Sequence, residues 1–135
     1  MNVVVVDQDS LFRKKLKRHL GKIRGVSIIG EASESQEAAA MIVNRKPDIV
    51  ILDTELTNGN GIEVLRHIKH LILRPTVIMV TDQPSQELRS ACSVAGADFF
   101  FDKVLEDRKV ANTVRRLCVP EPECNLSDHP ESRLN

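Results

Sequence analysis

The chain is 135 residues long with a mass of 15.1 kDa, and its 19 Lys and Arg residues balance its 19 Asp and Glu residues. This length suits one domain with a single core. The neutral balance, with four Phe and neither Tyr nor Trp, is against binding of nucleic acid through a basic, aromatic surface. No apolar run has the roughly 20 residues of a membrane span, and the N-terminus lacks a signal-peptide pattern. We therefore expect a cytoplasmic protein without nucleic-acid contacts or membrane insertion.

Five short apolar runs follow one another along the chain, at residues 3–6, 26–29, 49–52, 77–80 and 99–101. Continuous runs of this kind are typical of parallel strands that are covered on both faces. After each run, apolar residues recur with helical spacing, as Phe12, Leu16 and Leu20 do after the first. Five β-α units in this order predict an α/β fold, a doubly wound five-stranded parallel sheet with helices on both faces.

Residues at the expected helix ends agree with this division. Ser10 is placed to cap the first helix, Pro47 to end the second, and Gly96 to close the fourth in a left-handed conformation. The helical pattern stops near Cys118, and residues 119–135 contain three of the six prolines and few apolar groups. We therefore expect one domain over residues 1–118, followed by a disordered tail over residues 119–135.

Polar side chains follow the apolar runs, where the carboxyl ends of parallel strands share one edge of the sheet. Asp7 follows the first run and Asp53 the third. Thr81 follows the fourth, and Lys103 lies two residues beyond the fifth. Two carboxylates provide the oxygen ligands that Mg²⁺ prefers, and a hydroxyl and an ammonium group suit an anionic phosphoryl group. Each residue alone has an ordinary role in a cap, a turn or a solvated surface, but their joint placement predicts a site for phosphoryl transfer.

Over residues 2–118 the sequence resembles the receiver domain of two-component response regulators. The resemblance is carried by the segments VVVVDQDSLFR at 3–13, PDIVILDTELTNGNG at 47–61, VT at 80–81 and GADFFFDK at 96–103. It implies a flavodoxin-like fold with strand order 2-1-3-4-5. It also implies a signalling receiver of the stand-alone type rather than an enzyme, acting as a monomer or weak dimer whose output passes to a downstream effector protein.

The resemblance gives each site residue a role. Asp53 would accept a phosphoryl group from a histidine kinase or a phosphotransfer protein. Thr81 and Lys103 would bind the oxygens of that group. Mg²⁺ would be held by Asp7, Asp53 and the backbone carbonyl of Glu55. Transfer of the phosphoryl group would then change the surface that the receiver presents to its partners.

Four positions leave part of this assignment open. Gln8 stands where the family has a second acidic ligand, so a neutral amide replaces a charge that would hold Mg²⁺. Asp9 either takes over that role or caps the first helix. Asp82 follows Thr81 where a small residue is usual, and its charge opposes an approaching phosphoryl donor. Phe100 has the place of the family's switch aromatic, either as a moving ring or as static core packing.

Two other functions remain as alternatives. The first is an interaction module that works without phosphate, which Gln8 and Asp82 favour. The second is a phosphatase resembling the haloacid dehalogenase superfamily, with Asp7 as nucleophile in an Asp-x-Asp pattern. Under the preferred function, seven Lys and Arg residues between positions 11 and 24, with no acidic residue among them, indicate a surface for an acidic partner.

Overall fold

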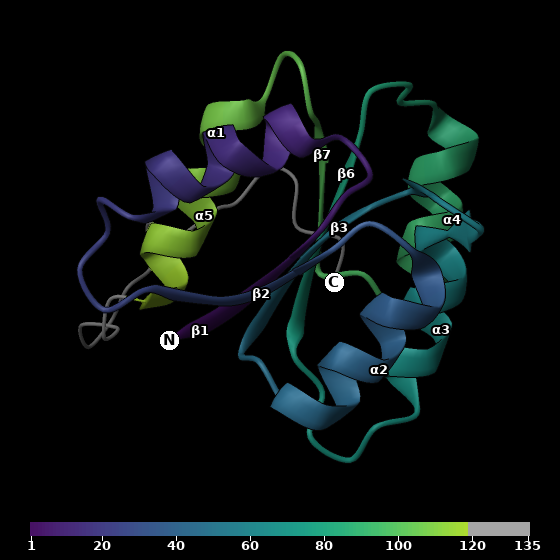
Figure 1. The fold of residues 1–135 in the computed structure, drawn as a ribbon. Helices are drawn as coiled ribbons and strands as arrows, with labels where there is room; N and C mark the ends of the chain where they lie inside the picture. The colour runs from purple at the N-terminus through teal and green to yellow at the C-terminus, as the bar shows by residue number, and fades with distance from the viewer. Residues whose placement is uncertain (119–135) are drawn as a thin grey trace, which may run out of the picture.

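In a computed structural model of the chain, residues 1–118 are described, and the segment 119–135, for which a disordered tail was expected, lies outside the described residues. Five parallel strands form one sheet in the spatial order β2-β1-β3-β6-β7 (Figure 1). They are β1 (Asn2–Val6), β2 (Ser27–Ala32), β3 (Ile49–Asp53), β6 (Thr76–Thr81) and β7 (Phe99–Asp102). Counted along these five strands, the order is 2-1-3-4-5, so the expected fold class is confirmed.

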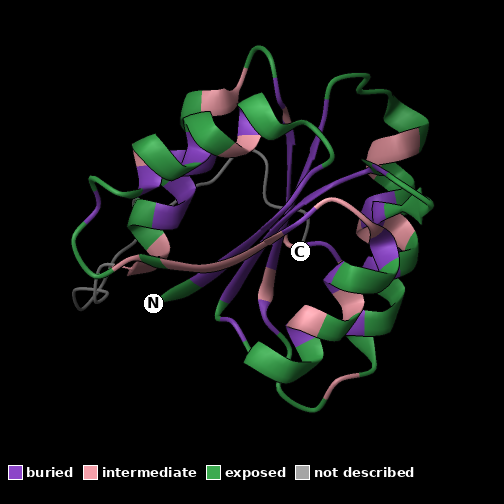
Figure 2. Cartoon of the chain, in the orientation of Figure 1, coloured by how far each residue is buried: buried purple, intermediate pink, exposed green. Residues whose placement is uncertain are grey.

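Five helices alternate with the strands and cover both faces of the sheet. They are α1 (Ser10–Leu20), α2 (Ser35–Arg45), α3 (Gly61–Lys69), α4 (Gln86–Ala95) and α5 (Asp107–Cys118). The helices α1 and α5 lie on one face, and α2, α3 and α4 lie on the other (Figure 1). Most strand residues are buried at the centre, β2 at the edge of the sheet is largely intermediate, and the helices turn exposed faces outward (Figure 2). Within residues 1–118, no helix has the length and apolar character needed to cross a bilayer.

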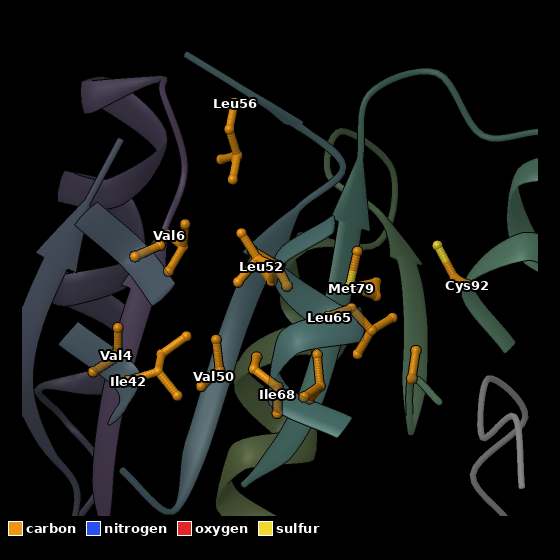
Figure 3. Packing of buried hydrophobic residues seen from close by; sticks show 14 of the residues in the cluster. Val4, Val6, Ile42, Val50, Leu52, Leu56, Leu65, Ile68, Met79 and Cys92 are labelled. Carbon is orange, nitrogen blue, oxygen red and sulfur yellow. The ribbon is translucent and has the colours of Figure 1, made fainter. Parts of the chain in front are cut away.

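The strands send alternate side chains into two apolar cores, one on each face of the sheet. Val4, Val50 and Met79 belong to the core under α2, α3 and α4 (Figure 3). Val5 and Ile51 belong to the core under α1 and α5. All five side chains are fully buried. Because both faces are covered, the central strands need apolar side chains on both sides, which explains their continuous apolar runs in the sequence.

A short antiparallel hairpin follows β3 and was not expected from the sequence. It consists of β4 (Glu55–Leu56) and β5 (Gly59–Asn60), with Glu55 opposite Asn60. Asn58 in its turn has φ +56°, a left-handed conformation that Asn tolerates better than most residues. The hairpin carries the chain from the carboxyl end of β3 into α3, so it lies beside the strand end that bears Asp53.

The ends of three helices test the expected boundary residues. The second helix ends before Pro47, at a left-handed Lys46, and the left-handed Gly96 closes α4 with φ +106°, both as expected. The expectation for α1 was wrong by one residue. Its N-cap is Asp9 and not Ser10, because Asp9 Oδ1 accepts hydrogen bonds from the N–H groups of Leu11 and Phe12 at 3.0 and 3.4 Å.

Replacing Asp9 by alanine is expected to lower the free energy of unfolding by about 1 kcal/mol, because the first turn of α1 loses its side-chain acceptor. Ser10→Ala is the matched control, since Ser10 lies inside the helix, and it should change stability by less than about 0.5 kcal/mol. Urea unfolding followed by far-ultraviolet circular dichroism measures both. Equal losses in the two variants would contradict the assignment of the cap.

Candidate functional site

Three charged side chains meet at the carboxyl edge of the sheet. Asp7 follows β1, Asp53 ends β3, and Lys103 follows β7. Lys103 Nζ lies 2.9 and 3.1 Å from the two carboxylate oxygens of Asp7, and 3.1 Å from Asp53 Oδ2. The three residues are 0, 4 and 9% exposed, in the order Asp7, Asp53, Lys103. Two carboxylates therefore share one ammonium group, and the buried cluster keeps an excess of negative charge.

Two further contacts fix the position of Lys103. Its backbone N–H donates to the carbonyl of Thr81 at 2.8 Å, which joins the chain after β7 to the end of β6. Its ammonium group lies 4.6 Å from the centre of the Phe12 ring, within the range of a cation–π interaction. Sequence reasoning had placed Phe12 only in the core. A phenylalanine five residues after the first aspartate is the sequence signal that could have assigned it to the site.

The cluster raises the pKa of both Asp53 and Lys103. For Asp53, burial and the negative charge of Asp7 raise the pKa from 3.8 to about 6, against the N–H of Glu55 and the charge of Lys103, which lower it. For Lys103, burial favours the neutral amine, but the hydrogen bond to Asp7 and the charges of both carboxylates outweigh it and raise the pKa. Lys103 therefore stays charged, and Asp53 becomes a carboxylate above about pH 6.

Asp7 is held in place by its backbone as well as by Lys103. Its Oδ1 accepts a hydrogen bond from the N–H of Asp9 at 2.8 Å, and the Arg13 guanidinium donates to its carbonyl. Arg13 also pairs with Glu31 at 3.1 Å, so Glu31 on β2 supports this contact. Sequence reasoning had counted Arg13 only among the cations of a basic surface. The structure gives Arg13 a second role, positioning the strand end that carries Asp7.

The donor set at this edge fits a hard divalent cation. Asp7 Oδ2 is buried and accepts no hydrogen bond, and its contact with Lys103 Nζ at 2.9 Å is an ion pair alone. An oxygen in that state has free lone pairs for a cation, and Mg²⁺ favours carboxylate oxygens and keeps several waters. No group of three or more His, Cys, Asp and Glu side chains that could hold a metal is found among residues 1–118. Asp7 and Asp53 bring two carboxylates together at this edge, through their shared contact with Lys103.

The remaining expected residues lie around this cluster at different depths. Thr81 is buried at the end of β6, and its hydroxyl oxygen accepts a hydrogen bond from the N–H of Gln83 at 3.1 Å. The Glu55 N–H donates to Asp53 Oδ1 at 3.1 Å. Gln8 and Asp82 are exposed at the surface near the strand ends. Asp9 is exposed too, and its Oδ1 is used by the cap of α1, so its structural role is confirmed.

Gly61 is a residue of this site that sequence reasoning had quoted in a motif without giving it a function. A Cβ atom at position 61 would lie 2.0 Å from the backbone carbonyl oxygen of Asp53 and 3.1 Å from the Cα of Thr54. Only glycine therefore allows the start of α3 to pack against the end of β3. The pair of glycines in the motif, Gly59 and Gly61, was the available signal for such a close approach.

Phe100 lies on the other side of the sheet from its two neighbours. Phe99 and Phe101 belong to the core under α1 and α5, and their rings stack with centroids 6.3 Å apart. The core packing expected for both is confirmed. Phe100 belongs to the core under α2, α3 and α4 and is 1% exposed.

Comparison with known proteins gives the class of this chain. A family model described as the response regulator receiver domain matches residues 3–115. The chain therefore belongs to the response regulator receiver domain family, a family of signalling domains. This membership argues against the alternative of a phosphatase in which Asp7 is the nucleophile.

Individual relatives agree with the family. The sensory transduction protein LytT of Bacillus anthracis is 31% identical over 116 residues, which cover 86% of this chain and 46% of LytT. The response regulator UvrY of Escherichia coli is 28% identical over 115 residues, which cover 85% of this chain and 53% of UvrY. The chain thus spans about half the length of these relatives.

Solved structures show the same architecture. The CheX-CheY-BeF3-Mg complex from Borrelia burgdorferi contains a chain that matches with a TM-score of 0.79 and 30% identity, over 89% of this chain and 90% of that one. The response regulator domain of CheB from Thermotoga maritima matches with a TM-score of 0.76 and 28% identity, over 90% of this chain and 98% of that one.

Proposed function

We propose that Asp53 accepts a phosphoryl group from the phosphohistidine of a histidine kinase or phosphotransfer protein, and that the domain then signals through contacts with an effector protein. The observation that carries the proposal is the cluster of Asp7, Asp53 and Lys103, buried together at the carboxyl edge of the sheet. In this cluster the ammonium group of Lys103 lies within hydrogen-bonding distance of both carboxylates, Asp53 as the proposed nucleophile and Asp7 as a proposed cation ligand. We propose the cytoplasm as the location, in keeping with the buried free thiol of Cys92.

Phosphoryl transfer needs a nucleophile that is charged and a site that tolerates more negative charge. A carboxylate oxygen of Asp53 attacks phosphorus, the new O–P bond forms as the P–N bond to histidine breaks, and the leaving imidazole keeps the electron pair. Lys103 then binds an oxygen of the transferred group, and the hydroxyl of Thr81, whose oxygen accepts from the Gln83 N–H, donates its own hydrogen bond to that group. Mg²⁺, held by Asp7, Asp53 and the Glu55 carbonyl, would neutralise charge during transfer.

The partner surface in this proposal is the exposed part of the cationic segment 13–24, which runs from α1 into the chain that follows the helix. Of the seven cations expected there, Arg13 and Lys17 pair with Glu31, and Lys15 pairs with Asp107. Lys14, Arg18, Lys22 and Arg24 are exposed and make no ion pair with any other residue in the range 1–118. An acidic surface on the kinase or phosphotransfer protein would complement these four charges, and transfer should slow as salt concentration rises.

The proposal is tested by incubating the protein with Mg²⁺ and acetyl phosphate and measuring the intact mass. The expected result is one added phosphoryl group on the natural chain and on Asp48→Asn, and none on Asp53→Asn. Asp48 is a matched control because it is an exposed aspartate next to the opposite end of β3. An adduct that survives in Asp53→Asn, or no adduct on the natural chain at millimolar Mg²⁺, would overturn the proposal.

A second candidate is an interaction module that signals without phosphate. The observation in its favour is that Gln8 offers an exposed amide in place of an acidic ligand, and that the exposed Asp82 adds negative charge next to Thr81. In that case Lys103 alone would neutralise the buried carboxylates, and partners would bind equally well to the natural chain and to Asp53→Asn. If acetyl phosphate changes the affinity of the protein for a partner, this candidate is excluded.

Gln8→Asp is expected to tighten Mg²⁺ binding roughly tenfold, because it adds a carboxylate next to the cation site. Isothermal titration calorimetry with MgCl₂ measures the change. Asn44→Asp is the control, since it adds the same charge at an exposed position in the last turn of α2. If Mg²⁺ affinity is the same in both variants, the side chain at position 8 lies outside the coordination sphere.

A further inference from the structure

The side chain of Arg89 on α4 covers the ring of Phe100 on β7. Its guanidinium carbon lies 4.9 Å from the centroid of the ring, the distance of a cation–π interaction. Arg89 is half-buried, whereas Phe100 is 1% exposed. Phe100 lies opposite Met79 in the sheet and shares its core with Leu88 and Cys92 of α4. The half-buried guanidinium therefore covers one face of a fully buried ring.

The ring is the main partner of the Arg89 side chain. Within residues 1–118, the guanidinium of Arg89 makes no ion pair at bonding distance and no hydrogen bond. The charge of Arg89 also acts on Glu106, whose pKa is lowered in spite of burial by the Asp102 N–H, by Lys109 and by the charge of Arg89. Glu106 Oε1 accepts a hydrogen bond from the N–H of Asp102 at 3.0 Å, directly before Lys103 in the chain.

We propose that Arg89 is a positioning residue that latches the Phe100 ring in its buried place and so couples α4 to the chain segment that carries Lys103. The ring cannot leave the core without breaking its contact with the guanidinium. Arg89 also attracts Glu106, which holds the backbone at Asp102, so a displaced Arg89 changes the support of that segment as well. This regulation of the site rests on the proposed function, in which the state of Asp53 is passed to the surface through this part of the fold.

The composition of the chain provides a direct test, because its four phenylalanines are Phe12, Phe99, Phe100 and Phe101. Biosynthetic replacement by fluorophenylalanine gives four ¹⁹F resonances, and Phe100→Leu identifies the one of interest. The other three rings belong to the core under α1 and α5 and report whether each variant is folded. The variants are Arg89→Met, which removes the charge and keeps the length, and Arg89→Lys, which keeps the charge. Arg66→Met on α3 is the control for loss of an exposed arginine.

Without Mg²⁺ or any phosphoryl donor, the minor population with an exposed Phe100 ring should rise about fivefold in Arg89→Met. It is measured by ¹⁹F saturation transfer and by the solvent isotope shift between H₂O and D₂O. Arg89→Lys should lie between Arg89→Met and the natural chain, and Arg66→Met should equal the natural chain. A Phe100 resonance in Arg89→Met with unchanged position, width and isotope shift overturns the latch. If Arg89→Met does not fold, an unchanged resonance in Arg89→Lys overturns it.

Beryllofluoride with Mg²⁺ then tests the link to Asp53 separately. Because a ligand shifts a two-state equilibrium only through its preference for one state, saturating beryllofluoride should change the population of the exposed ring in Arg89→Met, where that population is largest. A lower population means that the analogue favours the buried ring, and a higher one means that it favours the exposed ring. An unchanged population overturns the coupling. If no resonance responds to beryllofluoride in the natural chain, the proposed function fails, while the result without ligand still decides the latch.

Discussion

Lys103→Met is expected to lower the free energy of unfolding by about 3 to 5 kcal/mol at pH 8 without divalent cations. The substitution preserves length and apolar stem but leaves the buried carboxylates of Asp7 and Asp53 facing each other without a counter-charge. Their repulsion raises the pKa of Asp53 further. Since protonation of Asp53 removes that repulsion, the deficit should shrink as the pH falls from 8 toward 5. Urea unfolding at several pH values measures it.

Two further measurements separate this explanation from simple loss of packing. Mg²⁺ should restore part of the lost stability in Lys103→Met, because a cation between Asp7 and Asp53 replaces the ammonium charge. The double variant Lys103→Met with Asp53→Asn should also regain stability, since only one buried carboxylate remains. Lys14→Met is the control, as Lys14 is exposed on α1, and should be nearly neutral. A loss that neither Mg²⁺ nor Asp53→Asn reduces would contradict the electrostatic explanation.

Asp53→Asn is expected to abolish phosphorylation and at the same time to stabilise the fold by up to about 3 kcal/mol at pH 8. The folded protein raises the pKa of Asp53 from 3.8 to about 6, so the folded state favours the protonated acid. Stability of the natural chain therefore falls as the pH rises from about 4 to about 6, and the cost is fully present above that range. Asparagine carries no charge and avoids this cost at every pH.

The measurement compares urea unfolding of the natural chain and Asp53→Asn at pH 4 and pH 8, without divalent cations. The stability gain should be present in full at pH 8 and fall to about 0.5 kcal/mol at pH 4, where Asp53 is protonated in the folded protein and only about half protonated in the unfolded chain. Asp48→Asn should show no such gain, because Asp48 is exposed. An equal gain at both pH values would show that shape, and not charge, distinguishes asparagine from aspartate at position 53. The proposed phosphoacceptor thus lowers stability at the pH where it must be ionised to react.

The sequence was sufficient to predict the sheet and the three charged residues of the cluster, for a common physical reason. A strand buried on both faces needs a continuous apolar run, so the first polar residue after the run marks the end of the strand. Asp7 and Asp53 are such residues, and Lys103 follows its strand closely. The parallel arrangement then brings them to one edge without further information from local sequence. The roles given to Thr81, Glu55 and Phe100 remain predictions about a bound state.

Other parts of the site depend on contacts that leave no periodic pattern. Two-residue strands such as β4 and β5 have no alternation to detect. Asp9 and Ser10 are both good capping residues, so the start of α1 was uncertain by one position. The contact of Phe12 with Lys103 joins residues far apart in the sequence, and that of Arg13 with the Asp7 carbonyl joins a side chain to the backbone. Such contacts follow from tertiary packing, which spacing along the chain does not encode.

The alternation of β7 between the two cores has a consequence for how such a protein can diverge. Phe99 and Phe101 anchor the layer of α1 and α5, whereas Phe100 belongs to the layer of α2, α3 and α4. Side chains on opposite faces of the sheet share few neighbours, so substitutions in the two layers should have nearly additive effects. We propose that the layer of α1 and α5 faces the phosphoryl donor, whereas Arg89 and Phe100 belong to the other layer. The two layers can therefore accumulate substitutions independently. A lineage could exchange its upstream partner without rebuilding its downstream response.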